Sequence, residues 1–323
     1  MRVLGECQAL TRMGHKLAVV SYHLGRDIPG IRIDRIPNVP WYQRRQAGPN
    51  WHKPYLDALL LFKALKTLKS DSYNIVHAHL HEGLLVANAL RHLGLDLPIL
   101  FDAQGSLTGE MLAHEFFSPG SLRESIWSSL ERRLAKSCAM IATSSRRLQQ
   151  DLISSCGLSA HRVSYLPDGV DTELFDPDKH SGRAVRGRYG LDGPVIVYAG
   201  LLSKHQGIRF LIEKVAPKVL QEVSDARFLI VGFPEQEYRQ TASSLGLGQK
   251  FIFTGKVRYT ELPKFLAAAD VAVAPKFMIS GEANQKIMTY MAMGLPIVAL
   301  DYPYNQINRV HVASSLHQYG VVL

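Results

Sequence analysis

Short apolar runs alternate with helix-like stretches along most of this sequence, and no other feature constrains the fold as strongly. Two of these runs, residues 195–199 and 271–274, contain only Val, Ile, Tyr and Ala. Uninterrupted runs of this kind are typical of strands buried on both faces, as in parallel sheets that carry helices on each side. The pattern therefore predicts an α/β chain with doubly wound parallel sheets.

The alternation also predicts where the chain divides. The expected strands are residues 16–22, 74–80, 98–104, 139–144, 163–166, 195–200, 227–232, 251–255, 271–276 and 296–301. The expected helices are residues 6–13, 55–69, 84–93, 121–136, 145–155, 208–223, 261–268 and 286–293. A polar, turn-rich stretch interrupts the pattern at residues 167–194. We expect a domain junction there, with an N-terminal domain over residues 1–170 and a C-terminal domain over residues 171–323.

Both ends of the sequence look incomplete for such a fold. The chain opens in a helix followed by Gly14 and a strand, whereas a doubly wound domain usually opens with a strand and a glycine-rich turn. After Asp301 the pattern fades, and no helix follows the last apolar run at residues 319–323. We therefore expect a chain truncated at both ends, without the first strand of one domain and the last helices of the other.

Composition narrows the classes of function. The 323 residues are 46% hydrophobic and 20% charged, which is typical of a globular protein and excludes a disordered chain. The cysteines, Cys7, Cys138 and Cys156, are too widely spaced for a disulfide framework or a cysteine zinc site. The net charge of +9 is spread out, which argues against nucleic acid as a partner and fits small anions or an anionic membrane surface. Because no apolar run is long enough to span a bilayer and the start does not resemble a signal peptide, we expect a cytoplasmic location.

Residues 274–301 carry the clearest functional signal. A strand ends near Lys276, a loop contains Glu282 and Asn284, and a helix begins near Lys286. Ligands of open parallel sheets bind beyond the carboxyl ends of the strands, and the N–H groups at a helix start attract anions. The two lysines suit a diphosphate, and Glu282 could accept hydrogen bonds from sugar hydroxyls. An equally good interpretation is that Glu282 and Asn284 cap the helix and the lysines are solvated.

This segment resembles the donor-site segment of the family 4 glycosyltransferases, which are retaining enzymes of the GT-B fold. The resemblance rests on Glu-x-Asn-x-Lys at residues 282–286 and on Tyr-Met-Ala-Met-Gly-Leu-Pro-Ile-Val at residues 290–298. Further pieces match the family in order, at residues 14–16, 74–79, 167–175, 198–200, 206–207, 231–232 and 253–255. Together they cover about residues 1–301.

The resemblance implies two Rossmann-like doubly wound domains that face a cleft. It implies that the C-terminal domain holds a nucleotide diphosphate sugar and that a saccharide or lipid-linked acceptor enters from the N-terminal domain. A hexose-type unit would be transferred with retention. Neither a cofactor nor a metal is expected, because basic groups and helix ends neutralise the leaving diphosphate.

Several site positions depart from the family pattern. The second glutamate of its Glu-x7-Glu motif aligns with Thr289, and Ala283 and Gln285 replace glycines. The lysine after the first strand of the second domain aligns with Gln206, so Lys204 is the expected substitute, although it could equally be a solvated loop lysine. Glu282 is expected to be catalytic. The expected donor-binding residues are Lys204, Gly207, Lys276, Ala283, Asn284, Lys286 and Thr289.

Polar residues also gather at two strand ends in the N-terminal half. Strand alternation would place His77, His79 and His81 on one face. A zinc triad of this spacing is uncommon, so we interpret these residues as satisfied or acceptor-facing histidines and assign no metal ligand. Gln104 aligns with the family's histidine near the reacting sugar and is the second expected catalytic residue, although it cannot exchange protons near pH 7. The expected acceptor-side residues are His79, His81 and Ser106.

The stretch 41–53 mixes aromatic and basic residues outside any expected strand. It could touch lipid headgroups or a lipid-linked acceptor at the inner face of a membrane. A loop packed by its own aromatic residues is the simpler interpretation.

Two other functions stay open at this stage. A truncated, catalytically inactive glycosyltransferase-like protein would bind nucleotide sugars poorly. A sugar-nucleotide epimerase of the same architecture would release free sugar without an acceptor.

Overall fold

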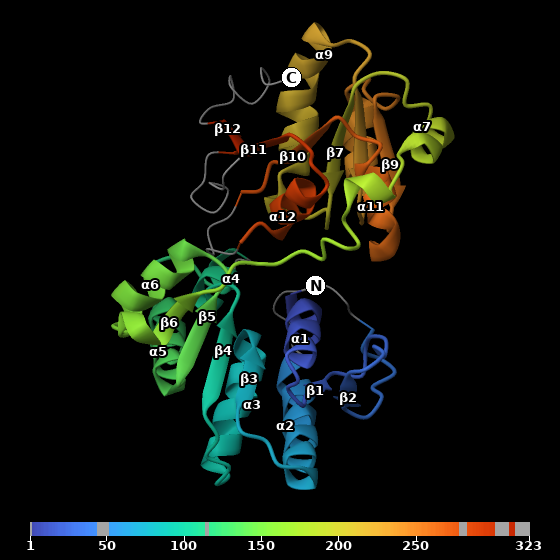
Figure 1. The fold of residues 1–323 in the computed structure, drawn as a ribbon. Helices are drawn as coiled ribbons and strands as arrows, with labels where there is room; N and C mark the ends of the chain where they lie inside the picture. Colours follow the sequence, from blue (N-terminus) through green and yellow to red (C-terminus); the bar gives the residue numbers. More distant parts are fainter. Residues whose placement is uncertain (1, 44–51, 114–115, 278–282, 301–309, 314–323) are drawn as a thin grey trace. The chain divides into compact units, whose positions relative to one another are not determined.

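The computed structural model describes residues 2–43, 52–113, 116–277, 283–300 and 310–313 (Figure 1). These residues form two compact units that divide between Pro167 and Asp168. Both units are α/β, and all strand pairs in their sheets are parallel. The expected fold class is therefore confirmed.

The N-terminal unit contains a four-stranded sheet in the order β3-β4-β5-β6 and a separate pair, β1-β2. Its elements are α1 (Arg2–Arg12), β1 (Ala18–Ser21), β2 (Arg32–Arg35), α2 (Lys53–Ser70), β3 (Val76–His79), α3 (Leu80–His92), β4 (Ile99–Ala103), α4 (Leu107–Ala113), α5 (Leu122–Ser137), β5 (Met140–Thr143), α6 (Arg146–Cys156) and β6 (Val163–Tyr165). In the register of β3 and β4, His79 lies opposite Asp102. Polar side chains from two neighbouring strands are thus brought to one end of the sheet.

Helices α5 and α6 begin where serine side chains cap them. The Ser121 hydroxyl accepts a hydrogen bond from the Glu124 N–H, and the Ser145 hydroxyl accepts one from the Leu148 N–H. Such caps satisfy N–H groups that have no partner within the helix. Both helices then pack apolar residues against the sheet, in a core that includes Phe101. Sequence reasoning placed both starts within one residue because the capping signal is local.

The C-terminal unit is a six-stranded sheet in the order β12-β11-β10-β7-β8-β9. Its elements are α7 (Arg183–Tyr189), β7 (Val195–Ala199), α8 (Ile208–Phe210), α9 (Ala216–Glu222), β8 (Arg227–Val231), α10 (Gln236–Ser244), β9 (Phe251–Gly255), α11 (Leu262–Leu266), β10 (Val271–Ala274), α12 (Gln285–Ala292), β11 (Ile297–Leu300) and β12 (Val310–Ala313). All five residues of β7 are buried, and they alternate between two apolar clusters. Helices α8, α9 and α10 cover one face, and α7, α11 and α12 cover the other.

The helix expected over residues 208–223 contains a π-helical turn at Leu211–Val215. Pro217 follows this turn and has no N–H to donate to the carbonyl of Glu213, one turn earlier. The wider turn carries the chain past this missing bond. The expected helix is present, but it is irregular in the middle.

Some elements were not expected. Strands β2 and β12 and helices α4, α7 and α10 have no counterpart among the expected elements. Helix α7 lies inside the stretch that we read as a polar junction, and it buries Val185 against the C-terminal core. A short helix with one apolar anchor among arginines and glycines gives no clear helical period, which is why the sequence did not reveal it.

The prediction that His77, His79 and His81 share one face of a strand is wrong. Strand β3 ends at His79, and Leu80 has a φ of +59°, a rare conformation for a residue other than glycine. The chain turns there into α3, which contains His81. Alternation relates side chains only while the strand continues, so it relates His77 to His79 but not to His81.

The close approach of backbone segments in the C-terminal sheet predicts which glycines are essential. A Cβ added at Gly232 would lie 1.9 Å from the carbonyl oxygen of Gly200, whereas one added at Gly187, within α7, would have no heavy atom within 4 Å. We expect Gly232→Ala to destabilise the protein by at least about 2 kcal/mol, because a backbone clash cannot be relieved by a rotamer change.

The matched control is Gly187→Ala, which should be neutral or stabilising by about 0.5–1 kcal/mol because alanine favours a helix over glycine. Thermal unfolding of the two variants measures the difference. Equal melting temperatures for both would contradict the predicted clash.

Candidate functional site

The order of the C-terminal sheet defines a ligand-binding position. The chain runs from β7 to β8 and β9 on one side, and then returns to place β10 on the other side of β7. In open parallel sheets the loops beyond two such strands usually diverge, and ligands bind in the crevice between them. Here the loops also touch, since the Phe277 N–H donates to the His205 carbonyl at 2.8 Å.

Gly207 makes this approach possible. It has a φ of +76°, and a Cβ in its place would lie 1.8 Å from the carbonyl oxygen of Pro275. Only glycine combines that backbone conformation with the absence of a side chain. Gly207 is one of the expected donor-binding residues. It also has a structural role, because it lets the two loops approach each other.

Lys286 occupies the centre of the polar cluster beyond β7 and β10. Its Nζ donates to Gln206 Oε1 at 2.6 Å and to Asn284 Oδ1 at 3.2 Å, and it lies 5.2 Å from the centre of the Tyr198 ring. Tyr198 also donates its hydroxyl to Gln206 Oε1 at 3.2 Å. Gln206, which the sequence analysis aligned with the family's lysine, is thus part of the cluster, and it holds Lys286 in place.

Two further polar residues of this cluster are buried. Lys276 and Asn284 are each only 4% exposed, and Lys276 Nζ donates to the Ala283 carbonyl at 3.3 Å. Asn284 precedes α12, but its side chain accepts no hydrogen bond from the first N–H groups of that helix. The capping role considered for Asn284 is therefore absent, and its side-chain oxygen accepts a hydrogen bond from Lys286 instead.

The other expected donor residues are placed differently. Thr289 is buried within α12. Lys204 is exposed, in the short turn Lys204–Gln206 before Gly207. Glu282 lies outside the described residues.

A buried carboxylate organises the strand ends of the N-terminal unit. Asp102, fully buried in β4, accepts hydrogen bonds from Arg2 Nε at 2.8 Å, His79 Nδ1 at 3.0 Å and Gln104 Nε2 at 2.8 Å. Burial opposes its ionisation, but the bonds from His79 and Arg2 outweigh burial and lower the pKa of Asp102 to about 2. Because Asp102 is ionised, Nδ1 of His79 carries the proton of that bond.

His79 and Gln104, both expected near the acceptor, are therefore fixed by the same carboxylate. Sequence reasoning missed Asp102 and Arg2. An aspartate inside the apolar run Ile-Leu-Phe-Asp-Ala was a visible signal, since a buried charge needs partners. Nothing in the sequence pointed to Arg2.

Glu131 on α5 forms a second, partly buried cluster. Its carboxylate accepts from the Leu107 N–H at 2.8 Å and from the Thr108 hydroxyl at 2.7 Å, so it caps the start of α4. The Ser106 hydroxyl lies 3.1 Å from this carboxylate, and His81 Nε2 lies 3.5 Å from it. The expected acceptor-side residues Ser106 and His81 are thus engaged in the support of α4.

In the aromatic and basic stretch at residues 41–53, some side chains are exposed and others are buried. Trp41 is 73% exposed, whereas Tyr42 is buried with its ring edge-on to His23 and His52. Lys53 pairs with Glu82 of α3. Arg44, Arg45 and Trp51 lie outside the described residues. No helix among the described residues has both the length and the apolar character needed to cross a bilayer.

Two family models match this chain. A model described as Glycosyltransferase Family 4 matches residues 2–174, and one described as Glycosyl transferases group 1 matches residues 193–314. The first alone covers more than half of the 323 residues. The chain therefore belongs to the family 4, group 1 glycosyltransferases, and the resemblance noted in its sequence is confirmed.

Curated relatives match parts of the chain. A GDP-mannose-dependent α-(1-6)-phosphatidylinositol monomannoside mannosyltransferase of Mycolicibacterium smegmatis is 34% identical over 147 residues, which cover 45% of this chain and 38% of that protein. The sulfoquinovosyl transferase SQD2 of Arabidopsis thaliana is 24% identical over 296 residues, which cover 90% of this chain and 54% of that protein. The chain spans about half the length of these relatives, or less.

Solved structures share the fold. HepE of Anabaena, solved in complex with UDP and glucose, is 19% identical with a TM-score of 0.66, and the match covers 90% of this chain and 74% of that one. Sucrose-phosphate synthase of Thermosynechococcus elongatus is 17% identical with a TM-score of 0.74, and the match covers 94% and 76%. The fold is thus GT-B, with two Rossmann-like domains, as the sequence predicted.

The Glu131 cluster predicts a pH-dependent contribution to stability. Burial opposes ionisation, but bonds from His81 and Thr108 lower the pKa of Glu131 from 4.5 to about 2. Because the folded-state pKa lies below the unfolded one, the carboxylate stabilises the fold above about pH 4.5, and this contribution is lost as the pH falls toward 2. We expect Glu131→Gln to cost about 3 kcal/mol at pH 7 and much less at pH 3.

Urea denaturation of both proteins at the two pH values measures this difference. Glu173→Gln, at an exposed position, is the control and should stay within about 0.5 kcal/mol of the wild type at both. A cost for Glu131→Gln that does not change with pH would contradict the assignment.

Proposed function

We propose that this chain transfers a hexose-type sugar from a nucleotide diphosphate sugar to a saccharide or lipid-linked acceptor, with retention of anomeric configuration. The observation that carries the proposal is Lys286, which Gln206 and Asn284 hold at the topological switch point of a family 4 chain. A fixed ammonium group at that position neutralises charge that develops on a leaving diphosphate. No cofactor is then needed for this step.

The donor site would use the charge that gathers around α12. Lys276 and Lys286 lie close to the start of this helix, where N–H groups also face outward. Lys204 is exposed and free to swing toward a phosphate, as the flexible side chain of lysine permits. Glu282 would accept hydrogen bonds from the donor sugar.

The acceptor side would use His79 and Gln104. Their shared bonds to Asp102 fix both side chains, which favours an acceptor hydroxyl held in one geometry. The exposed Trp41, beside a basic stretch of sequence, supports peripheral contact with a membrane that carries a lipid-linked acceptor.

Names of the relatives support the substrate classes. One relative is a GDP-mannose-dependent enzyme that acts on a phosphatidylinositol mannoside, and HepE was solved with UDP and glucose. These two differ in nucleotide base and sugar. We therefore propose only that the donor is a nucleotide diphosphate sugar. A donor screen identifies its base and its sugar.

Calorimetric titration with UDP, UDP-glucose and GDP-mannose tests donor binding. We expect one of these to bind, and Lys286→Ala to weaken its affinity about 10- to 100-fold, because a hydrogen bond to a charged group contributes about 1.5–3 kcal/mol. Lys264→Ala is the matched control, since Lys264 is exposed on α11 and should bind the donor like the wild type.

Three results would count against the proposed function or the role of Lys286 in it. No binding below millimolar concentration would indicate an inactive relative. Equal loss of affinity in both variants would remove the special role of Lys286. Free sugar released from the donor without any acceptor would indicate an epimerase.

Turnover tests the role of Glu282. We expect Glu282→Ala to lower kcat/KM at least about tenfold, because a hydrogen bond to the donor sugar is lost. The configuration of the product, read from the anomeric proton coupling by NMR, tests retention. Unchanged turnover of Glu282→Ala would exclude this residue from the site, and an inverted product would exclude retention.

A further inference from the structure

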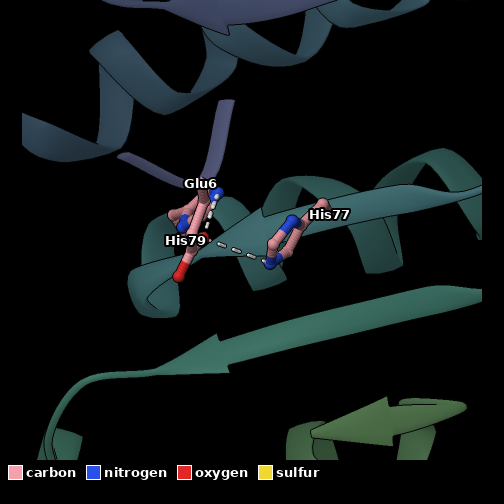
Figure 2. Close-up of side chains that lie close together, drawn as sticks. All are labelled: Glu6, His77 and His79. Carbon is pink, nitrogen blue, oxygen red and sulfur yellow. Dashed lines mark ion pairs between the residues drawn. The ribbon is translucent and has the colours of Figure 1, made fainter. Parts of the chain in front are cut away.

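Glu6, His77 and His79 converge within the N-terminal unit, and we call them the Glu–His–His cluster (Figure 2). The two histidines lie on one face of β3, with ring centres 4.3 Å apart. Glu6 comes from α1, and its Oε2 lies 3.8 Å from Nε2 of His77 and 3.7 Å from Nε2 of His79. One ligand atom from each residue lies within 4.8 Å of the others.

These distances suit a small divalent ion. Imidazole nitrogens and carboxylate oxygens bind zinc at about 2.0–2.2 Å, which places neighbouring ligand atoms of a tetrahedral site about 3.3–3.5 Å apart. The two ligand distances to Glu6 exceed this by only a few tenths of an ångström, so small side-chain rotations would close the site. Three protein ligands leave a fourth position for water or another ligand.

The surroundings orient His79 as a metal ligand. Its Nδ1–H donates to the buried carboxylate of Asp102 at 3.0 Å, so the proton sits on Nδ1 and the lone pair of Nε2 faces Glu6. A carboxylate that holds the far nitrogen of a histidine is the usual outer partner of a histidine metal ligand. Gln104 in turn donates to Asp102 at 2.8 Å and fixes that partner.

The charges around the cluster favour a cation. Glu6 and Asp102 are both acidic, and Arg2 is the basic residue that contacts them. Arg2 binds Glu6 through Oε1 at 3.0 Å, whereas Oε2 is the oxygen that faces the two imidazoles. With neutral histidines, two carboxylates and one guanidinium leave a net charge of −1 beside the ligand atoms.

Access to the ligand atoms is restricted. The side chains of Glu6, His77 and His79 are 16%, 23% and 21% exposed. The ligand atoms Glu6 Oε2 and His77 Nε2 are themselves buried, so an ion reaches them after a small side-chain movement, and burial reduces competition from water once it is bound. The cluster lies on α1 and β3 of the N-terminal unit, on elements other than those that carry Lys276 and Lys286.

We propose that Glu6, His77 and His79 bind one divalent transition-metal ion of the zinc type, with an open coordination position. Two nitrogen ligands select such an ion over Mg²⁺ and Ca²⁺, which prefer oxygen ligands. The ion links helix α1 to strand β3. The site shares His79 with the proposed acceptor side but contains none of the residues around Lys286, so it does not depend on the diphosphate chemistry proposed above.

Metal titration of the full chain tests the site. Protein freed of metal with EDTA is titrated with Zn²⁺ against a chromophoric chelator, and with Co²⁺ while its visible spectrum is recorded. We expect one equivalent of either ion to bind per chain, with Co²⁺ bands typical of nitrogen and oxygen ligation. Glu6→Gln and His77→Gln should each weaken Zn²⁺ binding by more than about tenfold, since loss of even an outer partner costs 10–100-fold.

Two histidine variants serve as controls, because the chain contains 13 histidines that can bind metal weakly. His161→Gln removes an exposed histidine from another element, and His81→Gln removes the nearby histidine that faces Glu131. Both should retain the stoichiometric site. Circular dichroism confirms folding, and if one ligand variant does not fold, the other decides the result.

The proposal is overturned by any of three outcomes. The chain binds no stoichiometric Zn²⁺, the ligand variants bind it as tightly as the wild type, or His81→Gln abolishes binding while Glu6→Gln does not. The last result would assign the metal to the histidines alone.

Discussion

Burial of the parallel strands on both faces is the constraint on which the rest of this structure depends. A strand such as β7, with all five residues buried, has no position for a charged side chain along its length. Polar and charged side chains are therefore displaced to the strand ends and to the loops beyond them. Both candidate regions, around Lys286 and around Asp102, lie at such ends.

The cluster around Lys286 shows how neutral side chains fix a cation in one position. Gln206 accepts a hydrogen bond from Lys286 Nζ at 2.6 Å, and Asn284 accepts a second one at 3.2 Å. A fixed ammonium group loses less conformational freedom on binding an anion than a mobile one, which favours binding.

In the N-terminal unit, the buried carboxylate of Asp102 likewise fixes the side chains around it. It joins helix α1, strand β3 and the end of β4 through Arg2, His79 and Gln104. A fully buried charge is stable only when such partners surround it. The same bonds that satisfy Asp102 orient His79, so the packing of the sheet end also fixes the side chain that we propose as a ligand or acceptor contact.

The sequence by itself determined the α/β class, most strands, the capped starts of α5 and α6 and the family, because these follow from local periodicity and short motifs. It placed Lys276, Asn284 and Lys286 in one segment, although it could not distinguish capping from binding. Only the tertiary structure showed that Glu6 meets His77 and His79, that His81 turns away toward Glu131, and that Gln206 holds Lys286. Contacts between residues far apart in the chain depend on how whole elements pack, and no local pattern encodes that.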